Sequence, residues 1–188
     1  MIILFGLAGS GKSLQGEILA NKYGWRWMSI GQLLRDLNDP EITAIQNRGE
    51  LVPDELVVNL MHTEMMKEVE LGRNAILDGY PRDQWQADWI VDHGDDRYID
   101  GAIIFDVSRE ELWHRLELRG RADDTREAIE KRWNIVEQNI YSMIERLRGA
   151  GVKITHINGE GEIEEITRRI EKVLLEWNLL DTQESQGK

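Results

Sequence analysis

The octapeptide Gly6-Leu7-Ala8-Gly9-Ser10-Gly11-Lys12-Ser13 is the most informative stretch of the chain, because it matches the pattern G-x-x-x-x-G-K-[ST]. It follows the apolar residues 2–5 and precedes residues 14–22, whose pattern is helical. Glycines let successive backbone N–H groups turn toward one centre, and the start of a helix adds positive potential there. The sequence therefore predicts a phosphate-binding loop between a first strand and a first helix.

The groups of this loop have distinct expected roles toward a nucleoside triphosphate. Backbone at Gly9, Ser10 and Gly11 is expected to surround phosphate oxygens, and Lys12 to reach the β and γ phosphates. The Ser13 hydroxyl is a candidate ligand of Mg²⁺. A glycine turn followed by a solvated lysine is the alternative, and it is disfavoured because motif, strand and helix coincide.

Short apolar runs alternate with helical stretches along the whole chain. The runs are residues 2–5, 25–29, 75–77, 102–107 and 152–157. This alternation predicts an α/β fold, namely a three-layer P-loop arrangement with a central five-stranded parallel sheet flanked by helices. Residues 2–5 and 102–105 have no polar alternate position, so we expect them at the centre of the sheet.

The chain of 188 residues has the length of one domain. Residues 31–72 amount to about two helices, more than one crossover normally uses, which predicts a small helical insertion at about residues 30–59. A polar turn predicts a short lid at about 118–126, followed by a long helix from about 125 to 148. The expected core is residues 1–29, 60–117 and 127–180, and the polar residues 181–188 are expected to fray.

Composition excludes several classes of function. The formal net charge is -12, which disfavours nonspecific binding to nucleic acid or to an anionic membrane. The chain has no cysteine, so disulfides, thiolate zinc sites and thiol catalysis are excluded. The apolar start is shorter than a signal-peptide core or a membrane span. We expect a soluble, cytoplasmic protein that acts as a monomer.

Two aspartates are candidates for holding Mg²⁺ together with the loop. Phosphoryl transfer on this kind of fold uses a carboxylate at the end of a neighbouring strand. Asp78 follows residues 75–77, and Asp106 ends residues 103–106 in a similar way. The segment that follows Asp78 favours it over Asp106.

That segment, Gly79-Tyr80-Pro81-Arg82, together with the N-terminal loop, resembles the adenylate kinase family of nucleoside monophosphate kinases. Residues 27–35 resemble the family segment H-L-S-T-G-D-L-L-R, and residues 49–53 resemble G-x-L-V-P. The resemblance implies that Arg35 and Arg82 clamp the phosphate of an acceptor nucleotide. It also implies that backbone at Leu51, Val52 and Gly79 lines the pocket for the acceptor base.

The resemblance also covers the region of the expected lid. Residues 115–124, followed by Arg132, resemble the lid of short adenylate kinases. This implies that Arg115 and Arg119 bind ATP, that Arg121 and Arg132 reach phosphates near the transferred group, and that Gly161 lies beside the ATP base. Arginine suits such a site because its planar, permanently charged fork meets two phosphate oxygens at once. Without the resemblance, ion pairs of Arg115 with Glu117 and of Arg132 with Glu130 are the simpler interpretation.

Three positions bear on which acceptor base is recognised. Gln86 stands where adenylate kinases use glutamine and pyrimidine kinases commonly use asparagine, which points to AMP. Ile30 stands where the family places a threonine, and Gln32 replaces its aspartate. Since Ile30 donates no hydrogen bond, we expect it to pack against the base and leave the discrimination to Gln86.

The leading hypothesis is transfer of the γ-phosphoryl group of MgATP to AMP, giving two ADP, with Mg²⁺ and without zinc. A kinase acting on UMP, CMP, GMP or an alcohol is one alternative, and a noncatalytic nucleotide switch is another. The chain has no guanine-reading N-K-x-D segment, and the seven tryptophans are interpreted as packing residues. The hypothesis requires Arg35 and Arg82 to face the mouth of the first loop.

Overall fold

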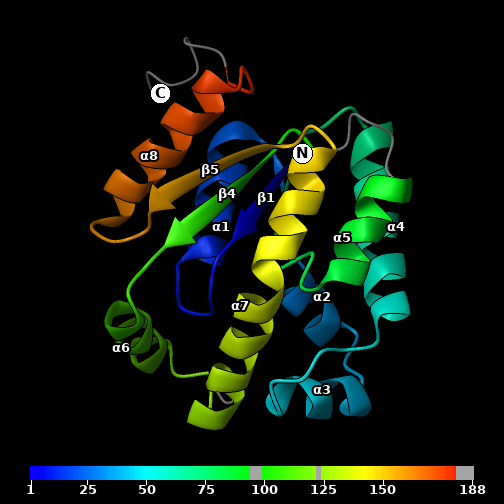
Figure 1. The fold of residues 1–188 in the computed structure, drawn as a ribbon, viewed down its shortest axis with the longest axis vertical. Helices are drawn as coiled ribbons and strands as arrows, with labels where there is room; N and C mark the ends of the chain where they lie inside the picture. The colour runs from blue at the N-terminus through cyan, green and yellow to red at the C-terminus, as the bar shows by residue number, and fades with distance from the viewer. Residues whose placement is uncertain (94–98, 122–123, 181–188) are drawn as a thin grey trace.

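The computed structural model describes residues 1–93, 99–121 and 124–180 and contains one parallel sheet (Figure 1). The strand order is β2-β3-β1-β4-β5. The strands are β1 (Ile2–Phe5), β2 (Arg26–Ser29), β3 (Ala75–Asp78), β4 (Gly101–Asp106) and β5 (Lys153–Asn158). The predicted five-stranded parallel sheet is confirmed, and each strand bound lies within one residue of its apolar run.

Helices cover both faces of the sheet. They are α1 (Lys12–Tyr23), α2 (Ile30–Asp36), α3 (Pro40–Asn47), α4 (Asp54–Glu70), α5 (Gln84–His93), α6 (Arg109–Arg119), α7 (Arg126–Gly149) and α8 (Ile163–Glu176). Helix α7 runs across one face, with α4 and α5 beside it, and α1 and α8 cover the other (Figure 1). Each face of the sheet carries an apolar core: the main core lies under α4, α5 and α7, and a second core lies under α1 and α8. Alternate residues of β1 enter them, Ile3 in the main core and Leu4 in the second. Burial on both faces explains why this strand has no polar position.

The sheet places one loop at the centre of the molecule. Strand β1 lies between β3 and β4, with Leu4 opposite both Asp78 and Ile103. The strand order therefore reverses beside β1, and the segments after β1 and β3 leave the same edge. Ligands of open α/β sheets bind at such a switch point, outside the carboxyl ends of the strands.

The insertion between β2 and β3 has more helices than the sequence predicted. It contains three, α2, α3 and α4, rather than two, because α2 and α3 are only 7 and 8 residues long. The expected boundary at residue 59 falls inside α4, which is continuous. The second half of α4 belongs to the main core, where Met61 and Met65 are buried.

A smaller apolar cluster joins α6, α7 and the first loop. Its buried members are Leu112, Leu116, Ile129 and Trp133. Helix α7 begins after Thr125, whose hydroxyl accepts a hydrogen bond from the Ala128 N–H. Residues 122–123 of the expected lid and the expected frayed tail, 181–188, lie outside the described residues.

Candidate active site

A cleft at the carboxyl edge of the sheet brings together most of the predicted site residues. Its lining includes loop residues, both acceptor arginines and three arginines from the α6–α7 region. The predicted residues among them are Lys12, Ser13, Arg35, Leu51, Asp78, Gly79, Arg82, Arg119, Arg121 and Arg132. Segments far apart in the sequence therefore face one space.

The first loop has the geometry of a phosphate cradle. Gly9 and Gly11 have φ values of +92° and +90°, in the left-handed region that favours glycine. A Cβ at Gly9 would lie 2.8 Å from the Leu112 carbonyl oxygen, so α6 approaches the loop too closely for any side chain there. The loop thus depends on glycine both for its conformation and for its packing against α6.

Lys12 folds back over this loop. Its Nζ donates to the Gly6 and Leu7 carbonyl oxygens, at 2.7 and 2.9 Å. Burial lowers the pKa of Lys12 to about 8, the Asp78 carboxylate opposes that shift, and the charges of Arg82 and Arg119 add to it. Several positive charges therefore gather around the loop, where a bound anion would favour the protonated amine.

Ser13 and Asp78 form the oxygen pair expected of a magnesium site. The Ser13 hydroxyl donates to Asp78 Oδ2 at 2.6 Å, and the Asp78 side chain is buried at the end of β3. Asp106 instead lies at the surface, with 61% of its side chain exposed, beside His156. The structure thus brings Asp78, and not Asp106, to the loop.

This oxygen pair suits Mg²⁺, which is usually held by one or two protein oxygens together with water and substrate phosphates. No group of three or more His, Cys, Asp or Glu side chains that could hold a metal occurs in residues 1–93, 99–121 and 124–180. The donors at the loop are thus hard oxygens and few in number. Such a set fits a metal that arrives with its nucleotide.

Arg35 and Arg82, which were predicted to hold the acceptor phosphate, converge at Gly31. A Cβ at that position would lie 3.6 Å from both Arg35 Nη1 and Arg82 Nη2. Arg82 Nε also donates to the Gly79 carbonyl oxygen at 2.8 Å. Burial, with the nearby Arg132 and Arg35 charges, lowers the pKa of Arg82, while Asp78 raises it. Both guanidinium groups line the cleft of Lys12, as a two-ligand site requires.

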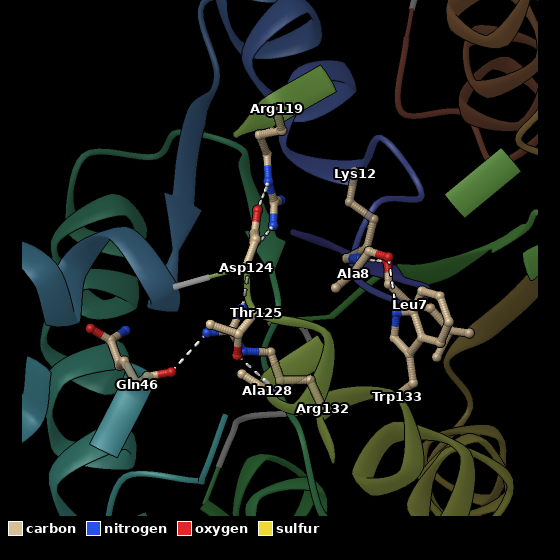
Figure 2. Close-up of polar contacts among 10 residues, drawn as sticks. All are labelled: Leu7, Ala8, Lys12, Gln46, Arg119, Asp124, Thr125, Ala128, Arg132 and Trp133. Atoms are coloured by element: carbon tan, nitrogen blue, oxygen red, sulfur yellow. Dashed lines mark hydrogen bonds and ion pairs between the residues drawn. The ribbon is translucent and has the colours of Figure 1, made fainter. Parts of the chain in front are cut away.

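The Asp124 carboxylate contacts two of the three arginines from the α6–α7 region, Arg119 and Arg132 (Figure 2). Its carboxylate accepts two hydrogen bonds from Arg119, at 2.7 and 2.8 Å, and lies 3.4 Å from Arg132 Nη1. Arg132 Nη2 also donates to the Gln46 carbonyl oxygen of α3, at 2.7 Å. No role was predicted for Asp124, although the segment that resembles the short lid includes it.

Arg115 and Gly161 lie outside the cleft lining. Arg115 pairs with Glu111 at 2.7 Å, rather than with Glu117, and its Nη1 donates to the Ser10 carbonyl oxygen at 3.3 Å. It therefore touches the outer side of the first loop. Gly161 lies between β5 and α8 with a φ of +110°.

The side chains expected to read the acceptor base are buried. Ile30 and Val52 belong to the main core. The Gln86 amide donates to Asp54 at 2.7 Å and to Asp83 at 3.0 Å, and its oxygen accepts from the Arg82 N–H at 2.9 Å. In this conformation Gln86 supports the loop that carries Arg82. The contact with Asp54 was not foreseen, since 32 residues separate the two positions.

A phosphate-binding loop after the central strand of this parallel sheet defines the class, a P-loop nucleotide-binding protein. A family model described as adenylate kinase matches residues 4–152. The chain belongs to the adenylate kinase family, whose members are phosphotransferases, and it is therefore an enzyme of that type.

Individual relatives agree with this assignment over most of their lengths. Adenylate kinase isoenzyme 1 of Caenorhabditis elegans is 32% identical over 177 residues, covering 88% of this chain and 83% of the relative. An adenylate kinase of Prochlorococcus marinus is 32% identical over 179 residues, covering 91% and 96%. One of Bacteroides fragilis is 35% identical over 187 residues, covering 92% and 97%.

Proposed function

We propose that this enzyme transfers the γ-phosphoryl group of MgATP to AMP and releases two ADP. The observation that carries the proposal is the shared cleft: Lys12 and Ser13 of the first loop face the same space as Arg35 and Arg82. One set suits a triphosphate and the other a monophosphate. Two anionic ligands held in one cleft are what a direct transfer between nucleotides needs.

The donor binds at the first loop in this proposal. Backbone N–H groups of Gly9, Ser10 and Gly11 hold its phosphates, and Lys12 moves from the loop carbonyls to the β and γ oxygens. Ser13 and Asp78 supply oxygen ligands for the metal. Mg²⁺ bound with ATP would neutralise part of the phosphate charge.

The acceptor phosphate lies between Arg35 and Arg82, in the cleft that the arginines of the α6–α7 region also line. In-line transfer develops charge on the equatorial oxygens of the migrating group, and fixed cations stabilise that charge. Arg119, Arg121 and Arg132 are placed to do so, and Asp124 keeps two of them oriented. The residues expected to form the short lid, at about 118–126, would also exclude water, which otherwise accepts the phosphoryl group.

An acceptor panel tests this proposal. Purified protein with MgATP is assayed for ADP formation with AMP, UMP, CMP and GMP in turn, with Lys12→Ala as control. We expect AMP to be the best acceptor and Lys12→Ala to lose at least about a hundredfold in rate. Absence of transfer to every monophosphate, with Lys12→Ala indistinguishable from the parent, would refute a kinase.

Burial of Ile30 and Gln86 favours a second candidate, a kinase with another preferred monophosphate. If neither side chain contacts the base, discrimination depends on backbone at Leu51 and Gly79 and on the shape of the pocket. A hydrogen bond to a base edge discriminates strongly, whereas shape alone discriminates weakly. A higher kcat/KM for UMP or CMP than for AMP in the same panel would establish this alternative.

The proposal also covers the oligomeric state of the enzyme and its location in the cell. Both phosphate-binding sets come from one chain, which supports a monomer, and the absence of cysteine suits the reducing cytoplasm. No helix in residues 1–93, 99–121 and 124–180 is long and apolar enough to cross a membrane. Sedimentation at micromolar concentration, with and without nucleotides, tests the monomer.

A further inference from the structure

Trp133 connects α7 directly to the first loop. Its indole Nε1–H donates to the Ala8 carbonyl oxygen at 3.0 Å, and the side chain is fully buried (Figure 2). The Trp113 ring lies 4.9 Å from the Trp133 ring between centroids, and the Arg109 guanidinium lies 5.0 Å from it. The indole is fully enclosed, so the hydrogen bond has a defined direction.

The Ala8 carbonyl matters because of the peptide unit to which it belongs. A trans peptide is planar, so the direction of the Ala8 C=O fixes the opposite direction of the Gly9 N–H. Gly9 has a φ of +92° and, like any glycine, a shallow preference between conformations. An outside contact is therefore needed to hold this peptide in the orientation that phosphate binding requires.

The neighbouring carbonyls of the loop are held from within it. Lys12 Nζ donates to the carbonyl oxygens of Gly6 and Leu7, and the Ser10 N–H donates to Leu7 at 3.1 Å. Lys12 would leave those carbonyls to reach a bound phosphate. The contact from Trp133 comes from outside the loop and involves neither Lys12 nor the two carbonyl groups that Lys12 contacts.

Trp133 also follows Arg132 in α7. Adjacent helical residues point about 100° apart, so one turn of α7 reaches two partners. Arg132 donates to the Gln46 carbonyl of the insertion, while Trp133 donates to Ala8. The same turn thus contacts both the first loop and the insertion.

We infer that Trp133 is a positioning residue for ATP: its indole N–H orients the Ala8–Gly9 peptide, and so the Gly9 N–H, for the donor phosphates. The inference rests on the proposed ATP site at the first loop. It assigns to the indole nitrogen a role that the burial of the ring alone does not require.

Removal of the N–H tests the inference. In Trp133→Phe we expect KM for MgATP, and the ATP dissociation constant by titration calorimetry, to rise about threefold to tenfold, as loss of one buried hydrogen bond implies. KM for AMP should change less than twofold, since the acceptor contacts remain. A protein with β-(3-benzothienyl)alanine at 133, which keeps the ring shape and lacks the N–H, should reproduce the ATP effect without loss of packing.

Two variants of the same cluster serve as packing controls. Trp113→Phe removes an indole that makes no hydrogen bond to the loop in the described structure, and Ile129→Val removes one methyl-sized group next to Trp133. Both should lower the melting temperature and leave the ATP constants within about twofold of the parent.

The inference is wrong if the benzothienyl protein binds ATP as the parent does, or if the controls weaken ATP binding as much as Trp133→Phe. Either result leaves the proposed function intact, provided the parent transfers phosphoryl groups. Failure of the parent to bind ATP would instead refute the proposed function itself.

Discussion

Gly49 lies against the first turn of α7 so closely that a Cβ at this position would be 2.4 Å from the Ala128 carbonyl oxygen. The φ of Gly49 is +68°, so the position also favours glycine by its conformation. Next to this contact, Glu50 accepts a hydrogen bond from Lys131 of α7 at 2.8 Å. The insertion that carries Arg35 therefore rests directly on the helix that carries Arg132.

Gly49→Ala should weaken acceptor binding more than it weakens donor binding. The new methyl group meets backbone atoms, so the insertion must move away from α7 and carry Arg35 with it. Misplacement of a substrate-holding group is costly, and we expect KM for AMP to rise about tenfold while KM for MgATP stays within about twofold.

The matched control is Gly72→Ala. Gly72 has a φ of +62°, and an added Cβ there would meet no atom within 4 Å. Both substitutions carry about the same conformational cost, on the order of 1 kcal/mol, so their difference isolates the contact with Ala128. Equal acceptor constants for the two variants would contradict a role for that contact.

Lys12→Met should abolish transfer and yet stabilise the protein without nucleotide at neutral pH. The pKa of Lys12 is about 8 in the folded protein against an ordinary 10.5, so below pH 8 the folded state keeps a charge that burial disfavours. A shift of this size corresponds to about 3 kcal/mol, and the lost hydrogen bonds offset part of it. We expect a net gain of about 1 to 2 kcal/mol in the free energy of unfolding at pH 7.

The sign of the pH dependence distinguishes this explanation from a general gain in packing. The parent recovers its stability as pH rises from about 8 to 10.5, because the folded protein releases the proton first. The advantage of Lys12→Met, measured by urea unfolding, should therefore shrink between pH 7 and pH 10. A constant difference over that range would contradict the burial of a charged Lys12.

The phosphate loop after β1 and the approach of Asp78 to that loop could be predicted from the sequence, because each depends on residues adjacent in the chain. The loop needs its glycines and Lys12 in fixed register with β1. Contacts made across the fold were not accessible. Trp133 has the pattern of a buried helical residue, and nothing in its own segment indicates a hydrogen bond to Ala8, 125 residues away.

The orientation of Gln86 has the same explanation. The family resemblance implied that Gln86 reads the acceptor base, whereas its hydrogen bond to Asp54 depends on where α4 begins. A motif fixes the place of a backbone segment within a fold. The rotamer of a side chain depends on neighbours from other elements.

Asp83→Asn tests the acidic pair beside Gln86. Burial raises the pKa of Asp83 to about 6, the backbone N–H of Gln86 opposes that shift, and the nearby Asp54 carboxylate adds to it. Because the folded pKa is raised above the ordinary 3.8, the parent loses stability as pH rises through that window. We expect the variant to match the parent at pH 4 and to exceed it by about 1 kcal/mol at pH 7, since solvent screens part of the effect.

Asp39→Asn is the control for that substitution. Asp39 caps α3 and, like Asp83, accepts a backbone N–H, here that of Glu41 at 2.8 Å, but it lies at the surface. Asparagine caps helices about as well as aspartate, so this change should have nearly the same effect at both pH values. If the effect of Asp83→Asn is also the same at both pH values, the pKa of Asp83 is not raised in the folded protein.

Asp78→Asn and Asp106→Asn together test which strand end serves the reaction. The two aspartates end β3 and β4, the strands on either side of β1, but only Asp78 meets Ser13 at the mouth of the loop. Asparagine retains the shape of the side chain and removes the charge that would attract a divalent cation.

We expect Asp78→Asn to lower kcat on the order of a hundredfold and to raise the Mg²⁺ concentration needed for half-maximal rate. Asp106→Asn should leave both within about twofold of the parent, because its carboxylate is exposed beside His156. A larger loss of rate in Asp106→Asn, or an unchanged Mg²⁺ requirement in Asp78→Asn, would exclude the Ser13–Asp78 pair as the magnesium site.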